Sequence, residues 1–63
     1  KTVAIEIKST ASVKEEHAET LNLLGPDIES ADLLLLSRDK QPKVYNQVTC
    51  LHWAEGIRQI LAG

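Results

Sequence analysis

The sequence predicts a small α/β domain in which two helices pack on a mixed β-sheet in three layers. Three observations predict it: residues 2–8 alternate apolar and polar side chains, residues 33–36 are all leucine, and two segments carry apolar residues at helical spacing. Alternation with a period of two is typical of a strand with one buried face, and a short apolar run bounded by polar residues is typical of a central strand. The order predicts a β-α-β-β-α arrangement, in which a parallel βαβ crossover precedes a short hairpin and a closing helix.

The first strand is expected over residues 2–8. We expect one of its faces to be buried and apolar and the other to be solvated and charged, with Val3, Ile5 and Ile7 on the first and Glu6 and Lys8 on the second.

A first helix is expected from Val13 onward. Ser12 and Glu15 have the S-x-x-E spacing of a capping box, in which both side chains accept hydrogen bonds from N–H groups of the first turn. Gly25-Pro26 should end the helix, because glycine adopts the left-handed cap conformation and proline cannot continue the helix. The residues expected to face the sheet are His17, Ala18, Leu21 and Leu24.

The second half of the chain is expected to contain a central strand, a hairpin and a helix. The strand is expected over residues 32–37, and the hairpin over residues 43–45 and 48–51. The hairpin turn, Asn46-Gln47, contains no glycine to supply the usual geometry. The closing helix should weaken by about 1 kcal/mol at Gly56 relative to alanine. Its apolar stripe is expected at Trp53, Ile57, Ile60 and Leu61.

Length, charge and cysteine content limit the classes of function. A domain of 63 residues buries only about 60% of the surface that its unfolded chain exposes, so its stability should be marginal. Seven basic against nine acidic residues give a net charge of −2, which argues against a surface that grips a phosphate backbone by charge alone. Cys50 is the only cysteine, which excludes an internal disulfide and suits a reducing cytoplasm. No apolar run approaches the length of a membrane span, and the strand-like first residues without an initiator methionine indicate a piece of a longer polypeptide.

Glu6 and Lys8 are the candidate functional residues. Because they lie two residues apart in a strand, they project to the same side and can converge on one point. A glutamate there can bind a hard cation such as Mg²⁺, and a lysine beside it can orient an attacking water or offset charge on a phosphate. The alternative is a solvent-facing ion pair without a function, which E-x-K on its own favours.

Three stretches of the chain resemble a known family. They are "VAIEIKST", "ADLLLLS" and "VTCLHWAEGIRQIL", separated by a capped helix and a short hairpin. In this order they resemble the restriction-endonuclease-like domain at the C-terminus of bacterial and archaeal P-loop ATPases of the AAA type, within the PD-(D/E)xK nuclease superfamily. That family has a strand ending in E-[VI]-K-[SA]-[ST] and a closing V…L-P-W…L pattern. The resemblance covers nearly the whole chain, with His52 where proline is common.

The resemblance implies metal-dependent cleavage of DNA. Glu6 and Lys8 would be the catalytic (D/E)xK pair, with Glu6 as a ligand of Mg²⁺ and an ATP-binding protein of the cytoplasm as the parent. The family's metal-binding aspartate lies on a preceding strand, whereas this sequence starts at Lys1 with the E-x-K strand itself. The phosphate loop G-x-x-x-x-G-K-[ST] does not occur in the sequence either. We therefore expect the chain alone to be inactive as a nuclease and to lack the ATPase domain.

A second hypothesis is a non-catalytic module for protein interaction or dimerisation, with a degenerate nuclease-like fold. The acidic net charge, the small core and the absent aspartate favour it. An exposed edge of the first strand would offer unpaired N–H and C=O groups to a second copy of the chain.

Cysteine and histidine are weaker candidates for a metal site or a catalytic site. Cys50 and His52, with His17, could be zinc ligands, but a structural zinc site needs four ligands. Cys50 with a histidine could also form a nucleophile pair, although no oxyanion feature supports it. A buried cysteine and a partly exposed histidine are the preferred interpretation.

The loop after the central strand and the aromatic residues are also candidates. Arg38, Lys40 and Lys43 could contact phosphate, but Asp39 lies among them and a solvated turn is preferred. Trp53 could be a binding anchor, although covering part of a small core is the simpler role.

Overall fold

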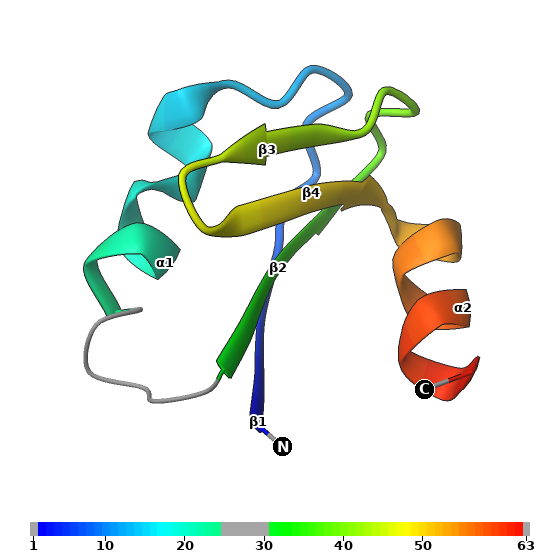
Figure 1. Cartoon of the computed structure of the whole chain (residues 1–63). Coiled ribbons are helices and arrows are strands. Elements are labelled where there is room, and N and C mark those ends of the chain that lie inside the picture. Colours follow the sequence, from blue (N-terminus) through cyan, green and yellow to red (C-terminus); the bar gives the residue numbers. More distant parts are fainter. Residues whose placement is uncertain (1, 25–30, 63) are drawn as a thin grey trace.

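The described part of the chain forms a three-layered α/β domain. The structure is a computed structural model that describes residues 2–24 and 31–62. Its elements, in chain order, are β1 (Thr2–Ile7), the 3₁₀ turn η1 (Glu15–Ala18), α1 (Glu19–Leu24), β2 (Ala31–Ser37), β3 (Lys43–Tyr45), β4 (Val48–His52) and α2 (Trp53–Ala62). This order confirms the predicted β-α-β-β-α arrangement (Figure 1).

The sheet is mixed, as predicted, and has the strand order β1-β2-β4-β3. β1 and β4 both pair in parallel with β2, which places Leu34 between Ile5 and Thr49. β3 pairs antiparallel with β4, with Val44 opposite Thr49. Within the described residues, β1 and β3 are therefore the outer strands of the sheet.

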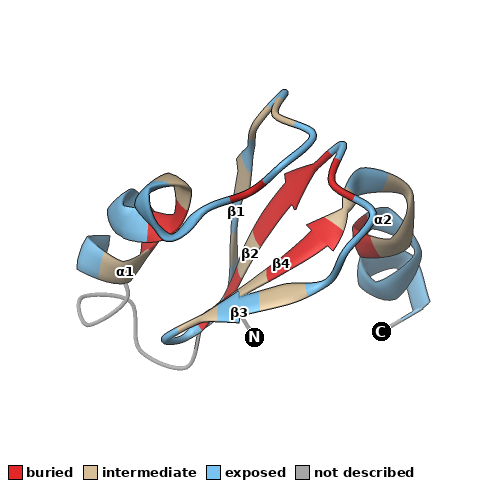
Figure 2. Cartoon of the chain, turned by 90° about the horizontal axis from the view of Figure 1, so that it is seen from above, coloured by how far each residue is buried: buried red, intermediate tan, exposed pale blue. Residues whose placement is uncertain are grey.

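The helices lie on opposite faces of the sheet. η1 and α1 cover one face and α2 lies on the other, as Figures 1 and 2 show from two directions. Leu35 belongs to the first face and Leu36, which contacts α2, to the second, so the leucines of β2 are buried on both faces as predicted. None of the described helices has the length and apolar character needed to cross a membrane. The main core lies between η1, α1 and the sheet, and its buried members are Val13, Ala18, Leu21, Leu33, Leu35, Val48 and Cys50.

The prediction for the two faces of β1 is wrong. Val3, Ile5 and Ile7 are exposed to 40%, 44% and 74%, whereas Ala4 on the opposite face packs against the main core. η1 and α1 lie over the face that carries Ala4, while α2 packs mainly on β2 and β4 and leaves the outer strand uncovered. The alternation correctly separates two faces, but the positions of the helices decide which of them is buried.

The predicted start of the first helix is also wrong. Lys14 is extended, with φ −122° and ψ 166°, and the first helical residue is Glu15. The N–H of Ser12, which Glu15 would accept in the predicted capping box, donates instead to Thr10 Oγ1 at 3.1 Å. The N–H of Val13 donates to a carboxylate oxygen of Asp39 at 2.8 Å. This long-range hydrogen bond holds residue 13 outside the helix. Leu24, which was expected to pack, is half-exposed, and the predicted stop at residues 25–26 lies outside the described residues.

The hairpin between β3 and β4 turns through Asn46. Its φ is 56°, which makes it the one non-glycine residue with a positive φ in the described part of the chain. Asparagine tolerates the left-handed region better than most residues, so it takes the role that glycine usually has in a tight hairpin. The structure thus confirms the predicted hairpin and explains how it forms without glycine. The Asn22 side-chain amide donates to the Tyr45 carbonyl at 3.3 Å and ties this hairpin to α1.

Gly56 is a point of close approach between α2 and the sheet. A Cβ atom added there would overlap Leu36 Cδ2 and lie 3.2 Å from Leu36 Cγ. Glycine has a lower helix propensity than alanine, but at this position it allows α2 to pack closely on β2. The predicted apolar stripe is not buried: Trp53, Ile57 and Ile60 are 38–50% exposed, and Leu61 is 82% exposed.

We expect Gly56→Ala to lower the free energy of unfolding by about 1 kcal/mol, even though alanine is the better helix former. The reason is that Leu36 is buried and must leave its rotamer to admit the added methyl group. Urea denaturation would measure the change. In a Leu36→Ala background the same substitution should become neutral or stabilising, and a stabilising Gly56→Ala in the wild-type chain would contradict the close approach.

Candidate functional site

Glu6 and Lys8 form an ion pair at the carboxyl end of β1. Glu6 Oε2 lies 2.8 Å from Lys8 Nζ, and the two side chains are 22% and 40% exposed. The N–H of Lys8 donates to the Leu36 carbonyl at 2.9 Å, which continues the pairing with β2 and fixes the backbone between the two charges. The pair therefore lies on the face covered by η1 and α1, half-buried, rather than on a fully solvated face as the sequence predicts.

The neighbours of Glu6 in the sheet do not add a second carboxylate. Glu6 lies opposite Leu35 of β2, and Asp32 lies opposite Val3, on the other face of the sheet. In the part of the chain that the structure describes, no three His, Cys, Asp or Glu side chains form a group that could hold a metal ion. A cation at Glu6 would compete with the Lys8 ammonium for the carboxylate and would need further oxygen ligands.

Asp39 is the most heavily bonded carboxylate among the described residues. One of its oxygens accepts from the N–H of Val13 at 2.8 Å and from Lys43 Nζ at 2.6 Å, and the other accepts from the N–H of Gln41 at 2.9 Å. Lys43 Nζ also donates to the Val13 carbonyl at 2.8 Å. Because Asp39 is only 6% exposed, the preferred interpretation of this loop as a solvated turn is wrong at its centre.

These contacts set the charge states of the pair. The hydrogen bond from Lys43, followed by those from Gln41 and Val13, lowers the pKa of Asp39 to about 2. The same hydrogen bond raises the pKa of Lys43. The Lys43 ammonium thus makes its contacts within the fold. Of the three basic residues in the loop, only Arg38 and Lys40 are exposed and could contact a phosphate.

The sequence carries little signal for this role of Asp39. Its spacing to Gln41 is that of an Asx turn, which is common in loops. The bond to Val13 joins residues 26 positions apart, so no local pattern could have revealed it.

Cys50 and the histidines do not form a site. The thiol is buried and its pKa is raised by desolvation, which keeps it protonated and unreactive. His17 Nδ1 accepts from the N–H of Lys14 at 2.8 Å, and His52 Nδ1 accepts from the N–H of Ala54 at 3.3 Å. The described residues therefore contain no zinc cluster of Cys50 with the two histidines, and the structure confirms the buried cysteine and partly exposed His52 that the sequence favours.

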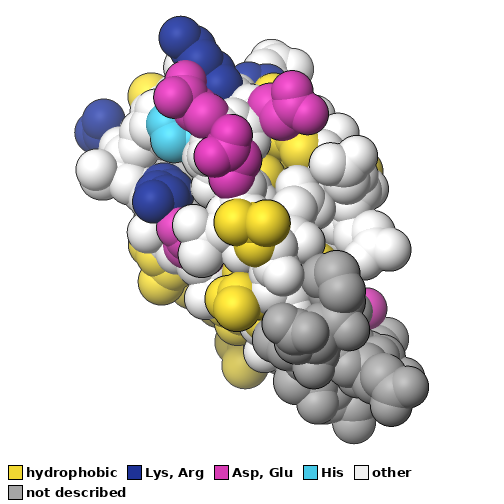
Figure 3. All heavy atoms as spheres, turned by 90° about the vertical axis from the view of Figure 1, so that its left-hand side faces the viewer, with side chains coloured by type: hydrophobic (Ala, Val, Ile, Leu, Met, Phe, Trp, Pro, Cys, Tyr) yellow, Lys and Arg dark blue, Asp and Glu magenta, His cyan; other side chains and the backbone are white. Residues whose placement is uncertain are grey.

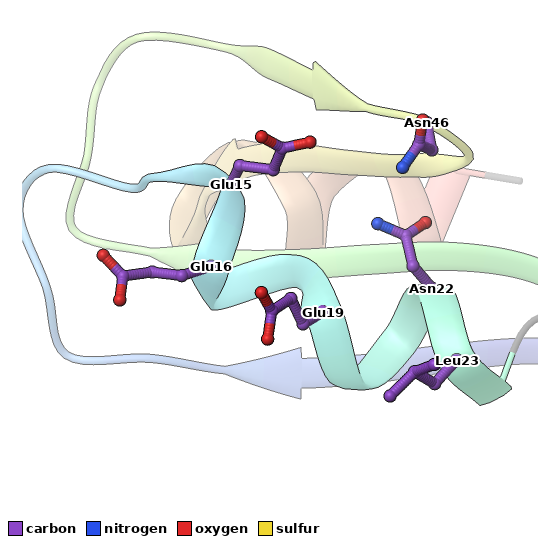
Figure 4. A pocket seen from close by; sticks show the side chains of 6 residues that line it. All are labelled: Glu15, Glu16, Glu19, Asn22, Leu23 and Asn46. Atoms are coloured by element: carbon purple, nitrogen blue, oxygen red, sulfur yellow. The ribbon is translucent and has the colours of Figure 1, made fainter.

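A hollow of about 480 Å³ lies between α1, η1 and the β3–β4 turn. Asn22 and Asn46 face each other across it, and three glutamates stand on the helical side (Figure 4). Acidic side chains also gather at one end of the face shown in Figure 3. Such a lining repels phosphate groups, so the hollow does not suit a nucleic-acid backbone. The residues that line it are Glu15, Glu16, Glu19, Asn22, Leu23 and Asn46.

Trp53 begins α2 and is half-exposed. Its ring lies against that of His52, with centroids 5.6 Å apart and planes tilted by 35°. Trp53 therefore contacts the last residue of β4 but is not among the residues that pack on the main core, against the preferred interpretation.

Among the described residues, Glu6 and Lys8 are the predicted catalytic residues, and the structure brings their side chains together as an ion pair. The pair stands at the end of a strand that is followed by a helix and a parallel strand, the order that the resemblance implies. No family model, curated protein or solved structure matches the chain.

Proposed function

We propose that this chain is the nuclease-like C-terminal domain of a P-loop ATPase, in which Glu6 and Lys8 contribute to Mg²⁺-dependent cleavage of DNA. The observation that carries the proposal is the convergence of the two side chains, with Glu6 Oε2 2.8 Å from Lys8 Nζ on one face of β1. The parallel pairing of β1 with β2 across an intervening helix supports it, because the resemblance implies this arrangement.

Each residue of the pair has a distinct proposed role. The Glu6 carboxylate offers the hard oxygen ligands that Mg²⁺ prefers, and its partial burial strengthens the attraction of a cation. The Lys8 ammonium, on the same side, would orient the attacking water or offset the charge that develops on the phosphate. Further ligands would come from water, substrate and residues other than those described.

The proposal predicts that a protein containing this domain nicks supercoiled DNA in the presence of Mg²⁺ or Mn²⁺. Glu6→Gln removes the anionic ligand and Lys8→Met removes the ammonium, and both keep the size of the side chain. We expect each to reduce nicking to the level of a protein-free reaction, because each removes a group that acts directly on the metal or the phosphate. Gel assays of nicked plasmid would measure the rate.

The control is Glu16→Gln, which removes a carboxylate from an exposed position on η1, a different element from β1. It should leave nicking unchanged. Circular dichroism of all three variants would show that the fold persists. Undiminished cleavage by both Glu6→Gln and Lys8→Met would exclude the proposed site and assign the cleavage to other residues.

We propose self-association as a second function, because a specific feature of β1 favours it. Val3, Ile5 and Ile7 are exposed on an outer strand of the described sheet, where apolar side chains and a strand edge are available together. In solution this function predicts a concentration-dependent rise in mass, which sedimentation would detect.

A further inference from the structure

The outer edge of β1 presents a regular row of backbone groups. The N–H of Lys8 donates to the Leu36 carbonyl of β2. Backbone groups of successive strand residues alternate in direction, so Ala4, Glu6 and Lys8 bond toward β2 and the residues between them point outward. The N–H and C=O groups of Val3, Ile5 and Ile7 therefore form the edge that another strand can join.

The charges next to this edge are self-complementary, because an antiparallel second copy of β1 can place an opposite charge against each of them. Glu6 and Lys8 lie on either side of Ile7, at equal spacing and with opposite sign. If a second β1 runs antiparallel with Ile7 opposite its own copy, Glu6 of each strand lies opposite Lys8 of the other, on the same face of the joined sheet. Opposite charges in directly facing positions stabilise a strand pair, and like charges destabilise it.

We infer that a second copy of this chain adds antiparallel to the outer edge of β1, in the register that pairs Ile7 with Ile7 and Glu6 with Lys8. This inference rests on the self-association proposed above and names its partner and register. Ile7 contributes both its outward hydrogen bonds and its exposed side chain at the two-fold axis. In this register Ile5 lies opposite Ser9 of the other copy, just beyond β1; the Ser9 carbonyl already accepts from Arg38 Nε at 2.8 Å, so the new ladder is centred on Ile7.

The register has a consequence for the proposed cleavage site. Each Glu6 carboxylate already lies 2.8 Å from its own Lys8, and in the dimer it gains the ammonium of the other copy as well. Two ammonium groups hold the carboxylate more strongly than one and oppose the entry of a cation. Self-association therefore favours the form of the site without Mg²⁺.

Cysteine cross-linking tests the register directly. Ile7→Cys places a thiol at the two-fold axis, where facing Cα atoms lie about 5.5 Å apart and can form a disulfide. Under mild oxidation this variant should link to itself. Ile5→Cys should not link to itself, but a mixture of Ile5→Cys and Ser9→Cys should link. The wild-type chain is the control, because its Cys50 is buried.

Charge reversal tests the ion pairs independently. Glu6→Lys and Lys8→Glu should each weaken dimerisation at least about tenfold, because each turns both facing pairs into like charges. The double variant with both substitutions restores opposite charges and should dimerise as the wild type does. Sedimentation equilibrium over rising protein concentration would measure the dissociation constants.

Each outcome bears on one of the two proposals. The inferred dimer is supported if Ile7→Cys links to itself and the double charge reversal restores dimerisation. This holds whatever the nicking assays show. A wild-type chain that stays monomeric at near-millimolar concentration overturns self-association itself. A dimer that links through Ile5→Cys alone, or through a mixture of Ile5→Cys and Ile7→Cys, overturns this register but leaves self-association in place.

Discussion

Leu35→Ala is expected to lower the free energy of unfolding by about 3 kcal/mol, the largest loss that we expect from one apolar substitution. Leu35 is 0% exposed and lies on the central strand β2, between the cover of η1 and α1 and the strands beside it. Its truncation leaves a cavity that the surrounding strands cannot close. A domain of 63 residues has a total stability of only about 3–9 kcal/mol, so this single substitution removes between about a third and all of it.

Urea denaturation followed by circular dichroism would measure this loss. The matched control is Leu23→Ala, which removes the same atoms from a side chain that is 77% exposed on α1. It should change the stability by no more than about 0.5 kcal/mol. Equal losses in the two variants would contradict the core described for this sheet face.

Acid is expected to destabilise the domain through Asp39. Its pKa is about 2 in the folded chain, whereas an aspartate in an unfolded chain has a pKa near 3.9, so the folded state binds the proton more weakly. The hydrogen bonds of the ionised carboxylate to Lys43, Gln41 and Val13 thus stabilise the fold fully above about pH 4. This stabilisation is lost as the pH falls from about 4 to about 2.

Asp39→Asn should remove this dependence. We expect its melting temperature at neutral pH to be lower by about 10 °C, because the amide cannot accept the same set of hydrogen bonds and leaves the Lys43 ammonium without its anion. Between about pH 4 and 2 its melting temperature should fall less than that of the wild type. Thermal melts at several pH values would test both statements.

The control for the pH series is Glu16→Gln, which removes an exposed carboxylate. Its melting temperature should follow that of the wild type at every pH. A wild-type fall between pH 4 and 2 that persists undiminished in Asp39→Asn would assign the acid sensitivity to another group.

Local patterns in the sequence predicted most of the secondary structure. The alternation of residues 2–8, the leucine run and the helical spacing from Trp53 correctly predicted β1, β2 and α2. These elements depend on side-chain periodicity, which neighbouring residues encode. The hairpin was also predicted, and Asn46 replaces the expected glycine because its backbone tolerates a positive φ.

Contacts between distant residues decided what the patterns could not. Asp39 accepts from the N–H of Val13 in the extended segment before the first helical residue, Glu15, although the capping pattern at Ser12 predicts a helix from Val13. Gly56 looked like a weak point in a helix, but it is required where α2 meets Leu36. Neither contact partner can be found from spacing along the chain.

The candidate site shows the same division. The period of a strand is enough to place Glu6 and Lys8 on one side, and the structure brings them within 2.8 Å. The positions of the helices decide which face of β1 is covered. The Glu6–Lys8 pair lies on the half-buried face, and Val3, Ile5 and Ile7 lie on the exposed face.

The sequence by itself determined the elements, their order and the pairing of Glu6 with Lys8, because backbone periodicity and local side-chain chemistry control all three. Only the tertiary structure decided which face of β1 is covered, where the first helix begins and that Asp39 is buried at the centre of its loop. These features depend on packing and hydrogen bonds between segments far apart in the chain, whose free energies outweigh local propensity.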